Sequence, residues 1–65
     1  MIGQVIWFND SKGYGFIESE GQSYFAHFRE IDAPGFKILK KDQNVSFEPG
    51  TSDKGLVAKS IKVVS

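Results

Sequence analysis

Residues 12–17 read Lys-Gly-Tyr-Gly-Phe-Ile, and this stretch decides the fold of the 65-residue chain. Successive side chains of a strand point to opposite faces, so Tyr14 and Phe16 share one face and their apolar neighbour lies on the other. Gly15 carries no side chain, which lets a second backbone or another planar group approach closely. We therefore predict a strand over residues 14–19 with one aromatic face and one core face.

A second aromatic segment, residues 24–28, reads Tyr-Phe-Ala-His-Phe. The same alternation places Phe25 and His27 on one face of a strand over 23–28. The opposite face then carries Tyr24, Ala26 and Phe28. If this strand pairs with 14–19, the outward rings of both strands form one platform, the type of surface on which single-stranded nucleic acid stacks its bases.

The segments around these two strands also predict β-structure. A first strand over 2–8 ends at the turn residues 9–11. Three large apolar residues at 6–8 break its alternation, so either both faces are apolar there or a bulge turns one residue outward. We expect Val5 to face the core and Trp7 to face solvent.

Turn residues divide the second half of the chain into short segments. Residues 20–22 make a tight connection, and 29–32 make a short helical turn whose Ile31 closes one end of the core. A long loop over 33–43 follows, and loops of this length in compact domains are often functional. Two further strands are expected, over 45–47 with both apolar ends inward and over 56–64. The first of these is expected to end at Pro49-Gly50.

Five short strands without a helix of useful length predict an all-β fold. The core is too small for two wide sheets, so the strands are expected to form a closed or nearly closed barrel. Closure also removes exposed strand edges.

Length and composition limit the class of protein further. A chain of 65 residues is expected to form one domain over 1–65 and to bury only about 60% of its unfolded surface. It has no cysteine, hence neither disulfides nor thiolate metal sites. It lacks a signal-peptide pattern and any apolar run as long as a membrane span. We expect a soluble cytoplasmic monomer.

Charge and aromatic content point to different modes of binding. Eight basic and eight acidic residues give a net charge of zero, which argues against a strongly electrostatic binder of polyanions. Aromatic residues make up 14% of the chain, more than a core of this size needs. The surplus suggests a surface use, although rings also suit the pleated surfaces of small all-β domains.

The two aromatic motifs, with Trp7-Phe8-Asn9 before them and Gly35-Phe36-Lys37 after them, resemble those of the bacterial cold-shock proteins. The resemblance extends from Gly3 to about Ile61. It implies a five-stranded antiparallel barrel of the OB type whose second and third strands present the binding face. It also implies an RNA chaperone that keeps RNA unpaired and thereby affects transcription or translation, with no cofactor and no turnover.

The resemblance also assigns site residues. The rings expected to bind nucleic acid are Trp7, Tyr14, Phe16, Phe25, His27, Phe28 and Phe36, with Phe8 as a partly buried contributor. Lys12 lies beside the platform as a phosphate contact, and Lys37 and Lys54 are further candidates in surrounding loops. Phosphate contacts position a strand without specifying its sequence. The other basic residues are better explained as solvated surface charges: Arg29, Lys40, Lys41, Lys59 and Lys62.

The chain departs from the family pattern at several positions. Gln4 and Ile6 stand where the family usually has lysines, Tyr14 replaces the commoner Phe, and Ala26 replaces Val. Glu18 shares the face of the rings and repels phosphates. We therefore expect binding dominated by stacking, with a shallow dependence on salt.

Two other classes of function have weaker support in the sequence. His27 is the only histidine and has no acidic, serine or cysteine partner at a motif spacing, so an enzyme or a metal site lacks support. A small barrel that binds a protein partner through the same aromatic surface is the alternative. The expected partners are single-stranded RNA and DNA, between which stacking does not discriminate, with no membrane and no metal.

Overall fold

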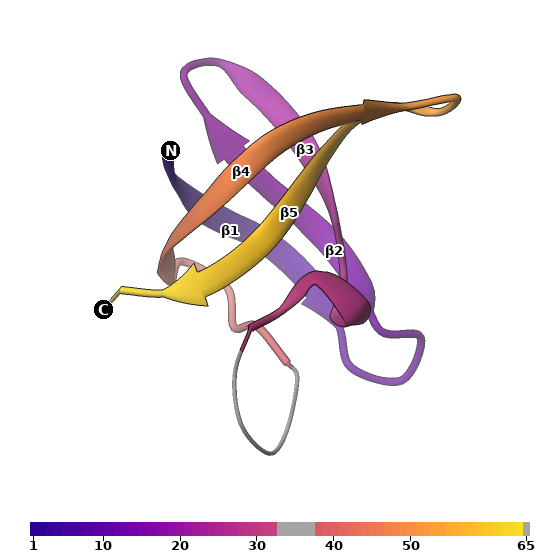
Figure 1. Ribbon diagram of the computed structural model, residues 1–65. Coiled ribbons are helices and arrows are strands. Elements are labelled where there is room, and N and C mark those ends of the chain that lie inside the picture. Colours follow the sequence, from indigo (N-terminus) through magenta and orange to yellow (C-terminus); the bar gives the residue numbers. More distant parts are fainter. Residues whose placement is uncertain (33–37, 65) are drawn as a thin grey trace.

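The protein, seen here as a computed structural model that describes residues 1–32 and 38–64, is a closed five-stranded barrel (Figure 1). The strands are β1 (Ile2–Asn9), β2 (Tyr14–Ser19), β3 (Gln22–His27), β4 (Asn44–Ser52) and β5 (Gly55–Val63), with the 3-10 turn η1 (Phe28–Glu30) after β3. This confirms the expected all-β barrel. Over the described residues, no helix is long and apolar enough to cross a membrane.

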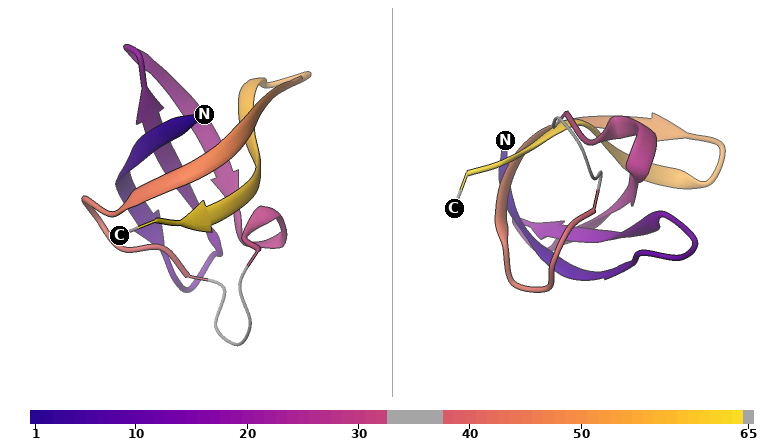
Figure 2. Two further views of the ribbon diagram at one scale, coloured as in Figure 1. Left: turned by 60° about the vertical axis from the view of Figure 1, so that its left-hand side comes forward. Right: turned by 90° about the horizontal axis from the view of Figure 1, so that it is seen from below.

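The barrel closes in the order β1-β2-β3-β5-β4, as the view along its axis shows (Figure 2). Four of the pairings are antiparallel, and β3 pairs with β5 in parallel. The sheet is therefore mixed, whereas the family resemblance implied antiparallel strands throughout. The parallel ladder is short, with Phe25 opposite Val57 and Ala26 opposite Ala58.

The core contains the inward side chains of all five strands and two residues from the connections. Ile31 is only 3% exposed and bridges to Ile61, so it closes one end of the barrel as expected. Leu39, which the sequence placed only in a loop, is also buried. The buried apolar residues are Val5, Ile17, Tyr24, Ala26, Ile31, Leu39, Val45, Phe47, Ala58 and Ile61.

A bulge in β1 explains how the three consecutive large apolar residues at 6–8 fit into the strand. Val5 lies opposite Ile17, whereas Trp7 lies opposite Phe16, so β1 has one residue more than β2 between these pairs. The extra residue is Ile6. Its side chain is 38% exposed and that of Trp7 is 41% exposed, so the bulge turns both outward and the prediction for Trp7 is confirmed.

The prediction that the fourth strand ends at Pro49-Gly50 is wrong, because β4 continues to Ser52. The β4–β5 ladder includes Pro49 opposite Ala58. On its other side, β4 pairs with β1 only over residues 44–46. Proline is tolerated in a strand that has one unpaired side, since its missing N–H is not needed there.

Gly15 permits close contact between β1 and β2. A Cβ at this position would lie 2.6 Å from Phe8 Cα and closer still to the carbonyl oxygen of Trp7. The expected approach of a second backbone is thus confirmed. The space is filled by β1, so it is not open to a planar ligand.

Replacing Gly15 with alanine is expected to destabilise the protein by roughly 1–3 kcal/mol, since the backbone of β1 has to move away from the new methyl group. The matched control is Gly50→Ala in β4, where the nearest atom is the flexible Lys59 Cε at 3.0 Å. That variant should change stability by less than about 1 kcal/mol. Urea unfolding followed by Trp7 fluorescence measures both, and equal stabilities would contradict the prediction.

Candidate nucleic-acid interface

Six aromatic side chains form one continuous group on the outside of the barrel. They come from β1, β2, β3 and η1, whose outward positions lie side by side because these strands are sequential neighbours in the sheet. We call this group the ring cluster. Its members are Trp7, Tyr14, Phe16, Phe25, His27 and Phe28.

Four of these rings form a compact quartet. The Trp7 ring centroid lies 5.6 Å from that of Tyr14 and 5.6 Å from that of Phe16. Tyr14 stacks on Phe25 at 5.7 Å with an interplanar angle of 29°, and Phe16 meets Phe25 edge-on at 5.8 Å. All four are half-buried or exposed, so faces and edges remain accessible from solvent.

The cluster continues through His27. Its ring lies 6.3 Å from Phe25 and 4.6 Å from Phe28. The backbone N–H of Arg29 donates to His27 Nδ1 at 3.3 Å, which caps η1 and fixes the orientation of the imidazole ring. The ring platform predicted from parity therefore extends over three strands.

Phe28 corrects the parity argument. Simple alternation placed it on the core face with Tyr24 and Ala26, but its side chain is 39% exposed and contacts His27. The reason is that β3 ends at His27 and η1 begins at Phe28. The position of Phe28 in the ring cluster agrees with the family resemblance, which assigned it to the binding rings, and not with strand alternation, which assigned it to the core face.

The remaining predicted site residues fall into three groups. Phe8 is half-buried and packs against the core opposite Gly15, in keeping with the expected partly buried contributor. Lys12 is exposed in the β1–β2 turn, where its N–H donates to Asn9 Oδ1 at 2.9 Å. Phe36 and Lys37 lie outside the described residues.

Lys54 is brought to the ring cluster by the barrel. It lies in the turn between β4 and β5 and lines a pocket of about 440 Å³ together with Phe16 and Phe25. The other lining residues are Ser23, Ser52, Leu56 and Val57. Leu56 and Val57 have no sequence signal that places them at the site. No local pattern reveals that β5 lies beside β3, because this is a consequence of closure.

Few charged side chains accompany the rings. Gln4 and Ile6 are exposed on β1, and Glu18 is exposed on β2 opposite Gln4. The described residues contain no group of three or more His, Cys, Asp or Glu side chains placed to hold a metal ion. The chemistry of this surface is therefore that of planar apolar faces flanked by a few charged side chains of both signs.

A closed five-stranded barrel with exposed rings on its second and third strands has the architecture of OB-type nucleic-acid-binding proteins. Comparison with known families agrees: the family model described as the 'Cold-shock' DNA-binding domain matches residues 1–64. The chain belongs to the cold-shock domain family. Proteins of this family bind nucleic acid and are not enzymes.

Curated relatives have similar lengths. The chain is 51% identical over 63 residues to the "Major cold shock protein CspA" of Pseudomonas aeruginosa, covering 95% of this chain and 91% of the relative. It is 50% identical over 64 residues to the "Cold shock-like protein CspA" of Bordetella pertussis, with coverage of 95% and 96%. A "Major cold shock protein CspA" of Bacillus cereus is 48% identical over 62 residues, covering 94% and 92%.

The exposed rings should contribute little to stability. Trp7→Ala is expected to cost at most about 1.5 kcal/mol, the size of one or two ring contacts. By contrast, Phe47 is 2% exposed, and Phe47→Ala should cost about 3–5 kcal/mol, enough to unfold much of the population of so small a domain. Thermal unfolding followed by circular dichroism compares the two, and a large loss for Trp7→Ala would show that the cluster is structural.

Proposed function

We propose that this protein binds single-stranded RNA and DNA with low sequence specificity by stacking bases on the ring cluster. The observation that carries the proposal is the continuity of six rings across β1, β2, β3 and η1. Every base has a π-face, and each stacked base contributes on the order of 1–3 kcal/mol. A duplex hides these faces, so the same surface discriminates against paired strands.

Such binding gives the protein the role of an RNA chaperone. A ligand that binds only the unpaired state of a hairpin shifts its folding equilibrium by mass action. Contacts that are individually modest and rapidly reversible are sufficient, and keeping RNA unpaired is a route to effects on transcription or translation. The proposal includes a monomer, since one chain supplies all six rings. It also includes action in the cytoplasm, a reducing compartment with which a cysteine-free chain is compatible.

Phosphate contacts play the smaller part in this proposal. Lys12 and Lys54 are exposed at two sides of the ring cluster, at positions from which flexible ammonium groups reach a backbone. The net charge of zero and the exposed Glu18 limit general attraction to a polyanion. Affinity should therefore depend on rings more than on salt.

A protein partner is the second candidate for the same surface. It is favoured by one observation, the adjacent exposure of Ile6 and Trp7 on β1, because exposed apolar patches also mark protein interfaces. The regular spacing of the other rings suits stacked bases better than a continuous apolar contact.

Phe25 is the ring with the most partners in the cluster, so Phe25→Ala should weaken binding of a single strand by about 1–3 kcal/mol, roughly 5- to 150-fold. Trp7 is the only tryptophan, and the quenching of its fluorescence by a pyrimidine-rich strand of about seven nucleotides measures affinity. The matched control is Ile2→Ala, which removes an exposed apolar side chain at the other end of β1.

The wild type should be quenched by the single strand and not by the corresponding duplex. If folded protein shows no quenching at any accessible concentration, nucleic acid is not the ligand of this surface. The protein-partner function then becomes the better one.

Adding a lysine beside Trp7 should increase the electrostatic contribution to binding. Ile6→Lys is expected to raise affinity at low salt and to steepen the slope of log K against log salt by about 0.7, the value for one more phosphate contact on a single strand. The control Ile2→Lys adds the same charge at the other end of the strand and should leave the slope nearly unchanged. Equal slopes for all three proteins would show that no bound phosphate lies near position 6 and would contradict a strand path beside Trp7.

A further inference from the structure

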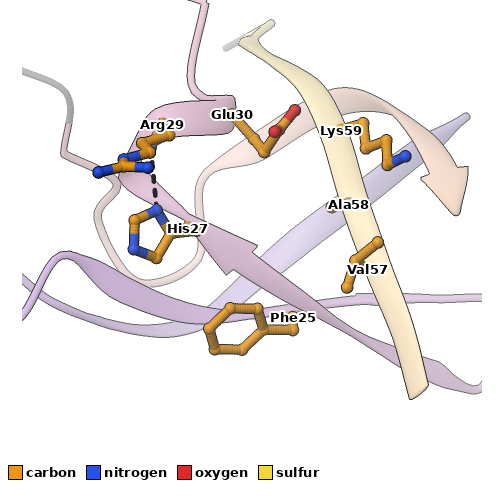
Figure 3. Close-up of a pocket in the computed structure, with 7 residues that line it drawn as sticks. All are labelled: Phe25, His27, Arg29, Glu30, Val57, Ala58 and Lys59. Carbon is orange, nitrogen blue, oxygen red and sulfur yellow. Dashed lines mark hydrogen bonds between the residues drawn. The ribbon is translucent and has the colours of Figure 1, made fainter. Parts of the chain in front are cut away.

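A second recess adjoins the ring cluster on the side of β5. It is a groove of about 290 Å³, which is near the lower end of the range for small-ligand sites, roughly 300–1,000 Å³. We call it the charged groove. Figure 3 shows its lining residues, which are Phe25, His27, Arg29, Glu30, Val57, Ala58 and Lys59.

The groove results from the way the barrel closes. The parallel ladder between β3 and β5 contains only the pairs at Phe25 and Ala26. Beyond it, β3 turns into η1 while β5 continues along β4, so the two strands separate. Phe25 and His27 belong both to this groove and to the ring cluster. A base stacked on these rings would therefore lie beside the groove.

The carboxylate of Glu30 is the positioned polar group of the groove. Glu30 as a residue is half-buried, and the exposed N–H of Ser60 donates to its Oε1 at 3.4 Å. Ser60 has a φ of 51°, in the left-handed region, at a register shift in the β4–β5 ladder. This bulge in β5 thus supplies the donor that holds Glu30. A carboxylate offers about four acceptor positions, so most of them remain for a ligand.

Two basic residues line the same groove as Glu30. Figure 3 shows Arg29 on the side of His27 and Lys59 on β5, with Glu30 between them. Both are exposed, and the sequence alone suggested solvated surface charges. A ligand that fits all three groups presents donors to the carboxylate and an acceptor to a neighbouring cation. A phosphate presents acceptors only, so Glu30 disfavours it.

We propose that the charged groove is a guanine subsite. Of the common bases, guanine alone has two adjacent donors, N1–H and the N2 amino group, next to the acceptor O6. The donors match the two oxygens of Glu30, and O6 matches the ammonium of Lys59 or the guanidinium of Arg29, a contact that basic side chains commonly make. The rings of Phe25 and His27 supply the stacking surface.

This inference rests on the proposed function and adds one selective position to it. Stacking on the other rings does not depend on the base sequence. Only the base that enters the groove is selected, through hydrogen bonds to its edge. The overall preference is therefore shallow across a strand and concentrated at a single nucleotide.

The test compares oligothymidine of about seven nucleotides with the same strand carrying one central dG, or one central deoxyinosine, which lacks only the N2 amino group. Affinities are measured by fluorescence anisotropy of an end-labelled strand. In the wild type, the dG strand should bind about tenfold tighter than oligothymidine, and inosine should lose most of that gain.

The diagnostic variant is Glu30→Gln, whose amide oxygen still accepts from Ser60 and so preserves the fold, as circular dichroism verifies. In this variant the ratio of dG to deoxyinosine affinities should fall to about one. Two proteins and two strands then form a double-mutant cycle, which isolates the interaction between the Glu30 side chain and the N2 amino group. The matched control is Glu20→Gln, which removes the same charge in the β2–β3 turn, at the other end of that hairpin from His27, and should keep the wild-type ratio.

The outcomes separate the two proposals. If wild-type protein binds all three strands equally, or if Glu30→Gln keeps the full preference for dG over inosine, the guanine subsite is overturned and general single-strand binding stands. If no strand binds the folded wild type, the proposed function fails and the subsite fails with it.

Discussion

The short parallel pairing of β3 with β5 is the contact on which the rest of the structure depends. It closes the barrel through the pairs Phe25–Val57 and Ala26–Ala58, and both alanines are almost fully buried. Small side chains there let two strands approach across the core. Without this contact β3 would be an exposed edge, which natural sheets avoid. The same contact places β5 beside the ring cluster and, because the ladder is so short, opens the charged groove next to it.

The core and the proposed binding surface occupy opposite faces of the same strands. On β2, Ile17 packs inside while Tyr14 and Phe16 lie outside, and on β3 Ala26 is buried between the outward Phe25 and His27. Because side chains alternate strictly between the two faces, packing of the inward residues fixes where the outward rings lie. The rings therefore do not have to stabilise the fold. A domain of this size has a small free energy of unfolding. A surface built from outward side chains leaves the packing of the core intact, which is an advantage for so small a fold.

The electrostatics fit a surface that relies on stacking. Opposite charges balance over the whole chain, and β1 presents Gln4 and Ile6 beside Trp7. Under the proposed function, association with a polyanion lacks long-range attraction, and short-range ring contacts dominate. Stacking alone does not discriminate between bases. In the proposed guanine subsite, the carboxylate of Glu30 therefore determines selectivity, because an acceptor with a fixed orientation distinguishes one base edge from another.

The sequence by itself determined the five strands, the inward and outward faces of β2 and β3, and most of the ring cluster, because alternation and turn residues are local properties of the chain. It left open whether residues 6–8 form a bulge, it ended β4 too early at Pro49, and it placed Phe28 inside by parity. These points depend on where a partner strand begins and ends. Only the tertiary structure decided that Val57 lies opposite Phe25, that Lys59 lines the same groove and that the Ser60 N–H donates to Glu30, because barrel closure joins strands some thirty residues apart and no local pattern encodes such a pairing.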